Sequence, residues 1–140
     1  GAMGEALISG LLRAGLVEPA NILVSDVSQA RLDYLKDKFW VTTVAENSAV
    51  VKEADLVVLA VKPHLILPVL RDAAALARPG QAFISIAAGI TTGQMESCLA
   101  GPVPVLRVMP NTPCLAGEGA SAVSAGKFAG RESVEKTMAV

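Results

Sequence analysis

Hydrophobic positions recur along this chain at two spacings in turn, which predicts alternating helices and strands. Apolar residues three and four apart predict amphipathic helices, whereas short β-branched or continuously apolar runs predict strands. The expected helices cover residues 5–14, 28–38, 47–54, 64–77, 92–99 and 132–140. The expected strands cover residues 21–25, 40–44, 55–61, 82–88, 104–109 and 120–124. This alternation is typical of an α/β fold with a doubly wound, mostly parallel sheet.

Single residues set several of the expected boundaries. Gly15 can take the left-handed conformation that ends a helix. Ser28 can cap the helix that follows it, and Thr91 or Thr92 can cap the helix that ends at Leu99. Pro68 has no amide donor, so we expect the regular part of the helix over residues 64–77 to start near it. Residues 55–61 are almost continuously apolar, which predicts a central parallel strand that is buried on both faces.

The composition favours an aliphatic core and argues against several classes of function. Hydrophobic residues make up 52% of the 140 residues and aromatic ones only 4%. The formal net charge is -1, and no basic stripe with interleaved aromatic residues occurs, so we expect no nucleic-acid partner. The longest apolar runs fall far short of the ~20 residues of a membrane span. One histidine and two distant cysteines argue against a metal site.

The two cysteines also bear on location. Cys98 and Cys114 do not have the spacing of metal ligands, although they could form a disulfide with each other. The sequence has no N-terminal basic stretch followed by an apolar run, which a secretory signal needs. We therefore expect a reducing, cytoplasmic setting, with an organelle as the alternative.

The first four residues pose the main question of function. Ligands of parallel α/β sheets bind at the carboxyl ends of the strands. Gly1-Ala2-Met3-Gly4 matches the last four positions of G-x-G-x-x-G, the fingerprint of dinucleotide-binding folds. Small residues at these positions would let a pyrophosphate approach the amides at a helix N-terminus. The same residues are also compatible with a flexible start, and the first three with the remnant of a cleaved tag.

A second candidate segment lies about 20 residues further on, where dinucleotide folds bind the adenosine ribose. Ser25 and Asp26 occupy that place. An aspartate there favours a ribose 2′-hydroxyl, whereas serines with a nearby arginine, here Arg31, favour a 2′-phosphate. Asp26 could equally cap the next helix, and Arg31 could be an ordinary surface residue.

Three further candidates follow later strands. Lys62 suits a phosphate or ribose contact, or it is a solvated lysine that closes a strand. Ala87-Ala88-Gly89 would let a flat ring lie against the backbone, or they form a tight turn. His64, alone at a helix start, is more typical of a structural residue than of a general acid.

Four stretches occur in the order and spacing of pyrroline-5-carboxylate reductases, and the chain resembles that family along essentially its whole length. They are residues 1–7 (GAMGEAL), 60–63 (AVKP), 85–91 (SIAAGIT) and 107–113 (RVMPNTP). The resemblance implies a Rossmann domain and the reduction of Δ1-pyrroline-5-carboxylate to L-proline with NADPH or NADH, the last step of proline biosynthesis. It also implies a helical C-terminal domain that forms dimers, often assembled into decamers.

The resemblance further implies which residues face the ligands. Cofactor contacts are implied for Ala2, Met3, Gly4, Ser25, Asn47, Ala60, Val61, Lys62, Pro63, Ala87, Ala88 and Gly89. Met109, Asn111 and Thr112 would face the substrate pocket. In the family the group beside the imine nitrogen comes from the C-terminal domain, so no catalytic acid is assigned to this chain.

The chain departs from the family's pattern at three places. The first strand and first fingerprint glycine would precede Gly1, so we expect a dinucleotide domain over residues 1–125 that is incomplete at its start, and a connection over residues 126–140. Strands beside the missing one would keep unpaired edges, and the isolated chain would be inactive and poorly stable. Val27 replaces an arginine of many bacterial relatives, which weakens the case for NADP. Trp40 replaces a glycine, and because tryptophan disfavours the left-handed conformation, the turn should differ there.

Two other functions fit parts of the sequence. A 3-hydroxyacid dehydrogenase relative would share the Gly-x-x-Gly start with methionine before the last glycine, but it would lack the RVMPNTP loop. A dinucleotide-binding or interaction module without activity is the other alternative. The resemblance favours the reductase over both.

Overall fold

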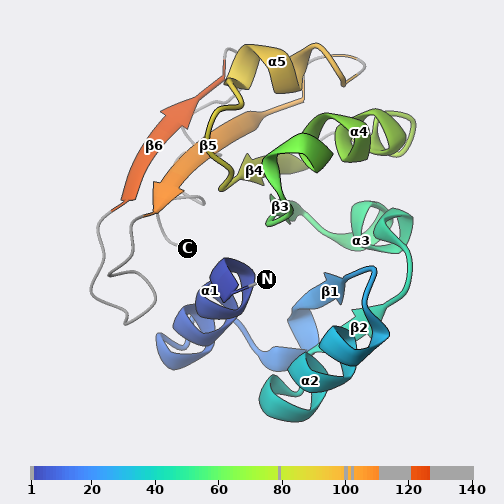
Figure 1. Ribbon diagram of the computed structural model, residues 1–140, viewed down its shortest axis with the longest axis vertical. Coiled ribbons are helices and arrows are strands. Elements are labelled where there is room, and N and C mark those ends of the chain that lie inside the picture. Colours follow the sequence, from blue (N-terminus) through green and yellow to red (C-terminus); the bar gives the residue numbers. More distant parts are fainter. Residues whose placement is uncertain (1, 79, 100, 102, 111–120, 127–140) are drawn as a thin grey trace.

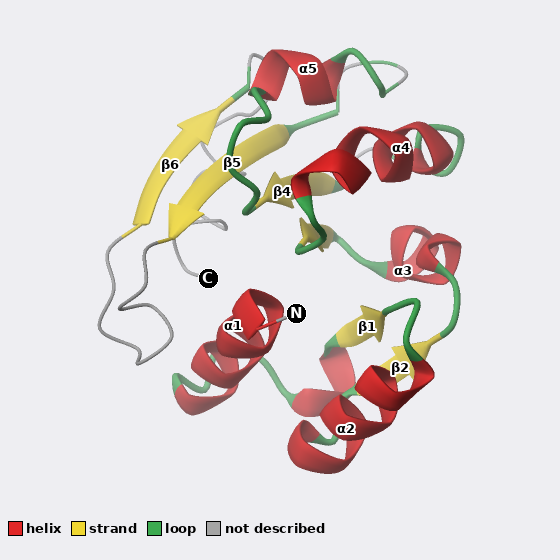
Figure 2. Ribbon diagram, viewed as in Figure 1, coloured by secondary structure: helices red, strands yellow, loops and turns green. Residues whose placement is uncertain are grey.

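Helices and strands alternate through the computed structural model, which describes residues 2–78, 80–99, 101, 103–110 and 121–126 (Figures 1 and 2). The helices are α1 (Ala2–Arg13), α2 (Gln29–Phe39), α3 (Asn47–Glu53), α4 (Pro63–Ala73) and α5 (Thr92–Glu96), with a 3-10 turn, η1 (Pro19–Asn21). The strands are β1 (Leu23–Ser25), β2 (Thr42–Val44), β3 (Leu56–Leu59), β4 (Ala82–Ser85), β5 (Val105–Pro110) and β6 (Ser121–Ala125). The expected helix over residues 132–140 lies outside the described residues.

The strands form two sheets. β1 and β2 pair in parallel, and β3, β4, β5 and β6 form the second sheet in that order. β3, β4 and β5 run parallel, whereas β6 runs antiparallel to β5. The predicted α/β fold with a mostly parallel sheet is therefore confirmed. Within the described residues β1 and β3 each pair on one side only.

The larger core lies between the four-stranded sheet and the helices α3, α4 and α5, which lie along one side of it in Figure 1. Ile66 and Leu70 of α4 and Met95 of α5 are fully buried there against Phe83 and Val105. Burial of such aliphatic and aromatic side chains is the main favourable contribution to folding. A smaller cluster of Ile8, Leu35 and Val41 joins α1 and α2 to the β1–β2 sheet.

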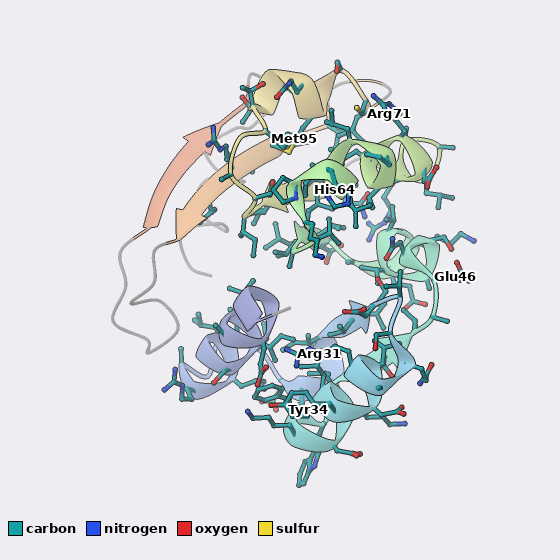
Figure 3. The ribbon with its side chains drawn as sticks, viewed as in Figure 1. Arg31, Tyr34, Glu46, His64, Arg71 and Met95 are labelled. Carbon is teal, nitrogen blue, oxygen red and sulfur yellow. The ribbon has the colours of Figure 1, made fainter. Side chains whose placement is uncertain are left out.

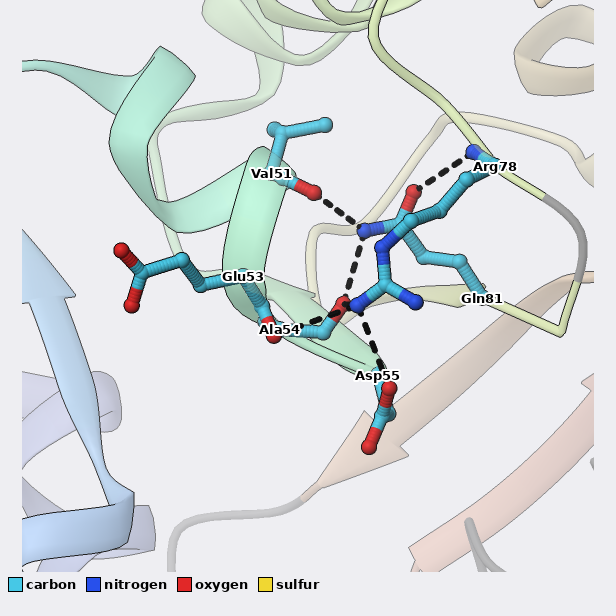
Figure 4. A network of polar contacts seen from close by, with 6 residues as sticks. All are labelled: Val51, Glu53, Ala54, Asp55, Arg78 and Gln81. Carbon is cyan, nitrogen blue, oxygen red and sulfur yellow. Dashed lines mark hydrogen bonds and ion pairs between the residues drawn. The ribbon is translucent and has the colours of Figure 1, made fainter.

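The end of α3 is held by two side chains from the turn before β4 (Figure 4). The Gln81 amide nitrogen donates to the backbone oxygens of Val51, at 2.6 Å, and Ala54, at 2.8 Å. The Arg78 guanidinium donates to the backbone oxygen of Ala54 and to the Asp55 carboxylate. Carbonyls at a helix C-terminus have no partner inside the helix, so these bonds satisfy them. Gln81 is completely buried, which makes its bonds structurally important.

Several predicted boundaries are confirmed. The Ser28 hydroxyl accepts from the Arg31 amide and caps α2, and Thr91 caps α5 in a reciprocal capping box with Gln94. Gly15 has a φ of 69°, so α1 ends at a left-handed glycine. Strands β1, β2, β3 and β4 are shorter than expected because their flanking residues form caps, bends, loops and the η1 turn.

The expected start of α4 near Pro68 is wrong. The helix begins at Pro63 and continues through Pro68. Pro63 suits the first helical position because a proline's fixed φ fits the helix and its missing N–H would have no partner there. The interruption at Pro68 is outweighed by Ile66 and Leu70, both fully buried against the sheet. Pro68 itself is exposed.

The expectation for Trp40 is also wrong. Trp40 ends α2 in the left-handed conformation, with φ 61° and ψ 28°, and its amide donates to the Lys36 oxygen at 2.8 Å. The turn therefore keeps the geometry that a glycine would supply. Trp40 is 80% exposed, so the large side chain extends into solvent, although the backbone strain of a residue with a Cβ atom remains.

The strand β3 is less enclosed than expected. Val57 and Leu59 are buried toward the main core, whereas Leu56 and Val58 are only half-buried on the other face. The predicted burial on both faces is found in β4 instead, where all four residues are buried. The difference follows from pairing, because β4 has a strand on each side and β3 has one.

Candidate functional site

The candidate loops follow neighbouring parallel strands, as the sequence predicts. Leu59 at the end of β3 is the register partner of Ser85 at the end of β4. The Ile86 amide donates to the Leu59 oxygen at 3.4 Å, which keeps the two chains together beyond the last pair. The loop of residues 60–62 and the loop of residues 86–89 therefore leave the same edge of the sheet. This carboxyl edge is where ligands of such sheets bind.

The first turn of α1 packs closely against the end of β3. A Cβ atom placed on Gly4 would lie 3.3 Å from the Ala60 Cβ atom. That separation is shorter than ordinary van der Waals contact, so only a residue without a side chain fits at Gly4 without displacing its neighbour. Dinucleotide fingerprints use their last glycine for the same close packing of helix and strand. Gly4 and Ala60 were both implied as cofactor contacts, and the structure brings them together.

A hydrogen bond between two side chains joins the end of β1 to the start of α3. The Ser25 hydroxyl donates to the Asn47 side-chain oxygen at 2.6 Å. Both residues were implied as cofactor contacts, although they lie far apart in the sequence. Ser25 is half-buried and Asn47 is exposed, so polar atoms of both remain close to solvent.

Asp26 forms a turn after β1. Its carboxylate accepts from the Ser28 amide at 2.9 Å, a local bond typical of aspartates in turns. Ser28, not Asp26, is the residue that caps α2. Val27 between them is fully exposed, whereas Asp26 is half-buried, so this loop presents an apolar side chain to solvent.

The loops after β3 and β4 differ in burial. Val61, Lys62, Pro63 and His64 are exposed at the start of α4, and Lys62 is its N-cap residue without a side-chain capping bond. Ala87 is buried, whereas Ala88 and Gly89 are exposed, and Gly89 has a φ of 82°. Gly89 therefore sits in a conformation that disfavours any residue with a Cβ atom.

Ser85 is a residue of this region that sequence reasoning missed. Its side chain is fully buried, and its hydroxyl accepts from the Ala87 amide at 3.2 Å. The bond orients the backbone at the start of the loop over residues 86–89. A single serine at the end of the otherwise apolar run AFIS was the signal that could have revealed it.

Glu5 is the second missed residue, and it gathers three polar side chains of α2. Its carboxylate accepts from Arg31 at 2.7 Å, Tyr34 at 2.8 Å and Lys38 at 2.8 Å. These hydrogen bonds, that of Lys38 above all, lower the pKa of Glu5 from 4.5 to about 2. The same bond raises the pKa of Lys38. Figure 3 shows Arg31 and Tyr34 on the side of α2 that faces α1.

The remaining implied residues are only partly described. Ala2 and Met3 lie in the first turn of α1, and Met109 lies near the end of β5, which runs parallel to β4. Asn111, Thr112 and Cys114 lie outside the described residues. Among the residues that the structure covers, no cluster of three metal-ligating side chains occurs, and no helix is long and apolar enough to cross a membrane.

Comparisons with known proteins agree with this geometry. The family model described as "NADP oxidoreductase coenzyme F420-dependent" matches residues 1–89. The pyrroline-5-carboxylate reductase of Corynebacterium melassecola is 40% identical over 139 residues, which are 97% of this chain and 51% of that protein. The pyrroline-5-carboxylate reductase of Methanosarcina acetivorans is 36% identical over 140 residues, which are 100% of this chain and 52% of that protein.

Solved structures give the same picture. A pyrroline-5-carboxylate reductase from Coxiella burnetii matches 99% of this chain and 51% of its own, with a TM-score of 0.90 and 34% identity. A pyrroline carboxylate reductase from Plasmodium falciparum with NADP bound matches 98% of this chain and 49% of its own, with a TM-score of 0.84 and 26% identity. The predicted resemblance and the Rossmann-like fold are confirmed. The chain spans about half the length of the relatives that it matches.

Proposed function

Because the chain belongs to the family described as NADP oxidoreductases, coenzyme F420-dependent, we propose that it forms the cofactor-binding part of a pyrroline-5-carboxylate reductase. The observation that carries the proposal is the close approach of Gly4 to Ala60. It packs the first turn of α1 against the end of β3, so that the amides at the helix N-terminus lie at the carboxyl edge of the sheet, where a pyrophosphate can bind. A larger residue at Gly4 would push α1 away from β3 and displace these amides.

Each proposed contact follows from the position of its residue. Ala2, Met3 and Gly4 at the N-terminus of α1 bind the pyrophosphate, where the helix dipole favours negative charge. Ser25 and Asn47 bind the adenosine ribose. Ala60, Val61, Lys62, Pro63, Ala87, Ala88 and Gly89 surround the nicotinamide half. Met109, Asn111 and Thr112 face the substrate.

The bound dinucleotide supplies a hydride to the C=N carbon of the pyrroline ring. The protein's task is to hold the two rings in reacting geometry, which lowers the entropic part of the barrier. The loop over residues 86–89 suits this task because Ser85 fixes its start and two small side chains leave its surface open. We propose NADPH as the coenzyme, with NADH also accepted; the NADP bound to the Plasmodium falciparum relative supports this.

The wider setting follows from the same resemblance. We propose a small-molecule substrate, pyrroline-5-carboxylate, and a place in proline biosynthesis in the cytoplasm. We propose the dinucleotide domain over residues 1–125 and a connection over residues 126–140 toward a helical domain that forms a homo-oligomer, either a dimer or a decamer. The proton donor would come from that second domain.

The test exploits two glycines of the same helix. A Cβ atom on Gly4 meets Ala60, whereas one on Gly10 meets nothing within 4 Å. We expect Gly4→Val to weaken NADPH binding by more than tenfold, about 1.4 kcal/mol, and Gly10→Val to bind as the unchanged protein does. The measurement is a fluorescence titration with NADPH, with circular dichroism to show that both variants are folded. Equal binding by the two folded variants would exclude the pyrophosphate site.

A further inference from the structure

We propose that Glu5 sets the coenzyme preference of the dinucleotide site. In this account, which rests on the proposed function, Glu5 holds the Arg31 guanidinium on α1 and away from the loop that would receive the ribose 2′ group. Glu5 is a specificity-determining residue that acts through Arg31. Its loss would shift the site toward the 2′-phosphate of NADPH.

The geometry of Arg31 carries the first step. Arg31 lies in the first turn of α2, and its amide is bonded to the Ser28 hydroxyl that caps the helix. Its guanidinium donates to Glu5 at 2.7 Å and lies 4.9 Å from the centre of the Tyr34 ring. Both contacts hold the side chain toward α1 and the second turn of α2. Long helical side chains ordinarily extend toward the helix N-terminus, here toward Asp26 and Ser28.

The second step concerns the charge of the loop after β1, residues 26–28, which would receive the adenosine ribose. Residues 21–30 contain no lysine or arginine, and the Asp26 carboxylate lies in this loop. Arg31 is the first cation after β1. A loop with a carboxylate and an engaged arginine also accepts the ribose 2′-hydroxyl of NADH, so Glu5 limits the preference for NADPH. The same loop with a released arginine suits a 2′-phosphate, because guanidinium groups bind phosphate by charge-assisted hydrogen bonds.

The third step concerns the two cations, Arg31 and Lys38, that bind the Glu5 carboxylate. One carboxylate accepts from both Arg31 and Lys38, and the three hydrogen bonds it accepts keep it ionised at any pH at which the enzyme would work. Substitution of Glu5 by glutamine removes that charge and keeps the shape of the side chain. Lys38 lies two turns beyond Arg31, too far along α2 to replace it at the loop.

The experiment compares the dissociation constants of NADPH and NADH by nicotinamide fluorescence in the full-length protein that contains this chain. We expect Glu5→Gln to lower the dissociation constant of NADPH relative to that of NADH by about tenfold. The matched control Glu18→Gln makes the same chemical change at an exposed position and should leave the ratio unchanged. Lys38→Met should also leave it unchanged. The double variant Glu5→Gln/Arg31→Met should return to the unchanged ratio, because the released group is then absent.

Three outcomes would overturn the inference. They are an unchanged ratio in folded Glu5→Gln, the same shift in Glu18→Gln, and a shift that persists in the double variant. If Glu5→Gln does not fold, Glu5→Asp takes its place, because its shorter carboxylate keeps the charge but reaches Arg31 less well; an unchanged ratio there also overturns the inference. Failure of the unchanged protein to bind either nucleotide would instead exclude the proposed function.

Discussion

The Ser25 hydroxyl donates a 2.6 Å hydrogen bond to the Asn47 side-chain oxygen and so joins the end of β1 to the first turn of α3. This bond links two segments that the account assigns to the adenosine ribose. Together with the packing of Gly4 on Ala60, it holds the candidate cofactor loops in place through contacts within the chain itself. Such preorganisation reduces the ordering that a ligand would otherwise have to impose.

The bond between Ser25 and Asn47 gives the first prediction. Ser25→Ala and Asn47→Ala should each weaken NADPH binding about fivefold, equivalent to about 1 kcal/mol for one hydrogen bond. The double variant should lose less than the sum of the two, because the residues act through one contact. Ser48→Ala, at the exposed neighbouring position in α3, is the control and should bind normally. Strictly additive losses in a fluorescence titration would contradict the account.

The low pKa of Glu5 gives a prediction about acid stability. Hydrogen bonds lower this pKa from 4.5 to about 2 in the folded state, so the carboxylate stabilises the fold fully above pH 4.5. The stabilisation is lost as the pH falls from 4.5 toward 2. Urea unfolding at a series of pH values should therefore show a shallower acid decline in Glu5→Gln than in the unchanged protein. Identical declines would show that the Glu5 contacts do not form in solution.

The buried Gln81 gives a prediction about folding. Gln81→Leu removes the donors to two backbone oxygens of α3 and should lower the free energy of unfolding by about 2 kcal/mol. Gln29→Leu removes an exposed bond to Asp33 and should change it by less than about 0.5 kcal/mol. Urea unfolding followed by circular dichroism measures both. Equal effects of the two substitutions would contradict the role of Gln81 in capping α3.

Trp40 gives a prediction in the stabilising direction. Glycine accepts the left-handed conformation at this position without the strain that a Cβ atom causes. Trp40→Gly should therefore unfold at a higher urea concentration than Trp40→Ala, by about 0.5–1 kcal/mol in free energy. Both variants remove the indole, so they differ only in the conformational preference of the backbone at position 40. A less stable glycine variant would mean that the left-handed turn is absent in solution.

The sequence predicted the elements well where the pattern was local. Capping by Ser28 and Thr91, the left-handed Gly15 and the α/β alternation all depend on a few adjacent residues, and all are confirmed. The predictions for Pro68 and Trp40 were wrong because they considered only the local conformational preferences of proline and tryptophan. At Pro68, tertiary packing of the neighbouring side chains outweighs the lost hydrogen bond. At Trp40, the helix end requires the left-handed backbone whatever the residue.

The candidate site was predictable in its members but not in its contacts. The fingerprint and the order of the loops indicated Gly4, Ser25 and Ala60, and the family resemblance indicated Asn47. Their pairing depends on how the strands and helices pack. Glu5 and Gln81 escaped notice because their partners lie far away in the sequence and no spacing rule connects them. Side chains that join elements in this way can be recognised only once the elements are placed.

The most direct test is the assay of NADPH oxidation with Δ1-pyrroline-5-carboxylate, on the protein expressed from the longest reading frame that contains this chain. We predict that NADPH is consumed only when the pyrroline is present and that an equal amount of L-proline forms. A folded protein that binds NADPH but forms no proline, or that oxidises 3-hydroxyisobutyrate or 6-phosphogluconate instead, would contradict it.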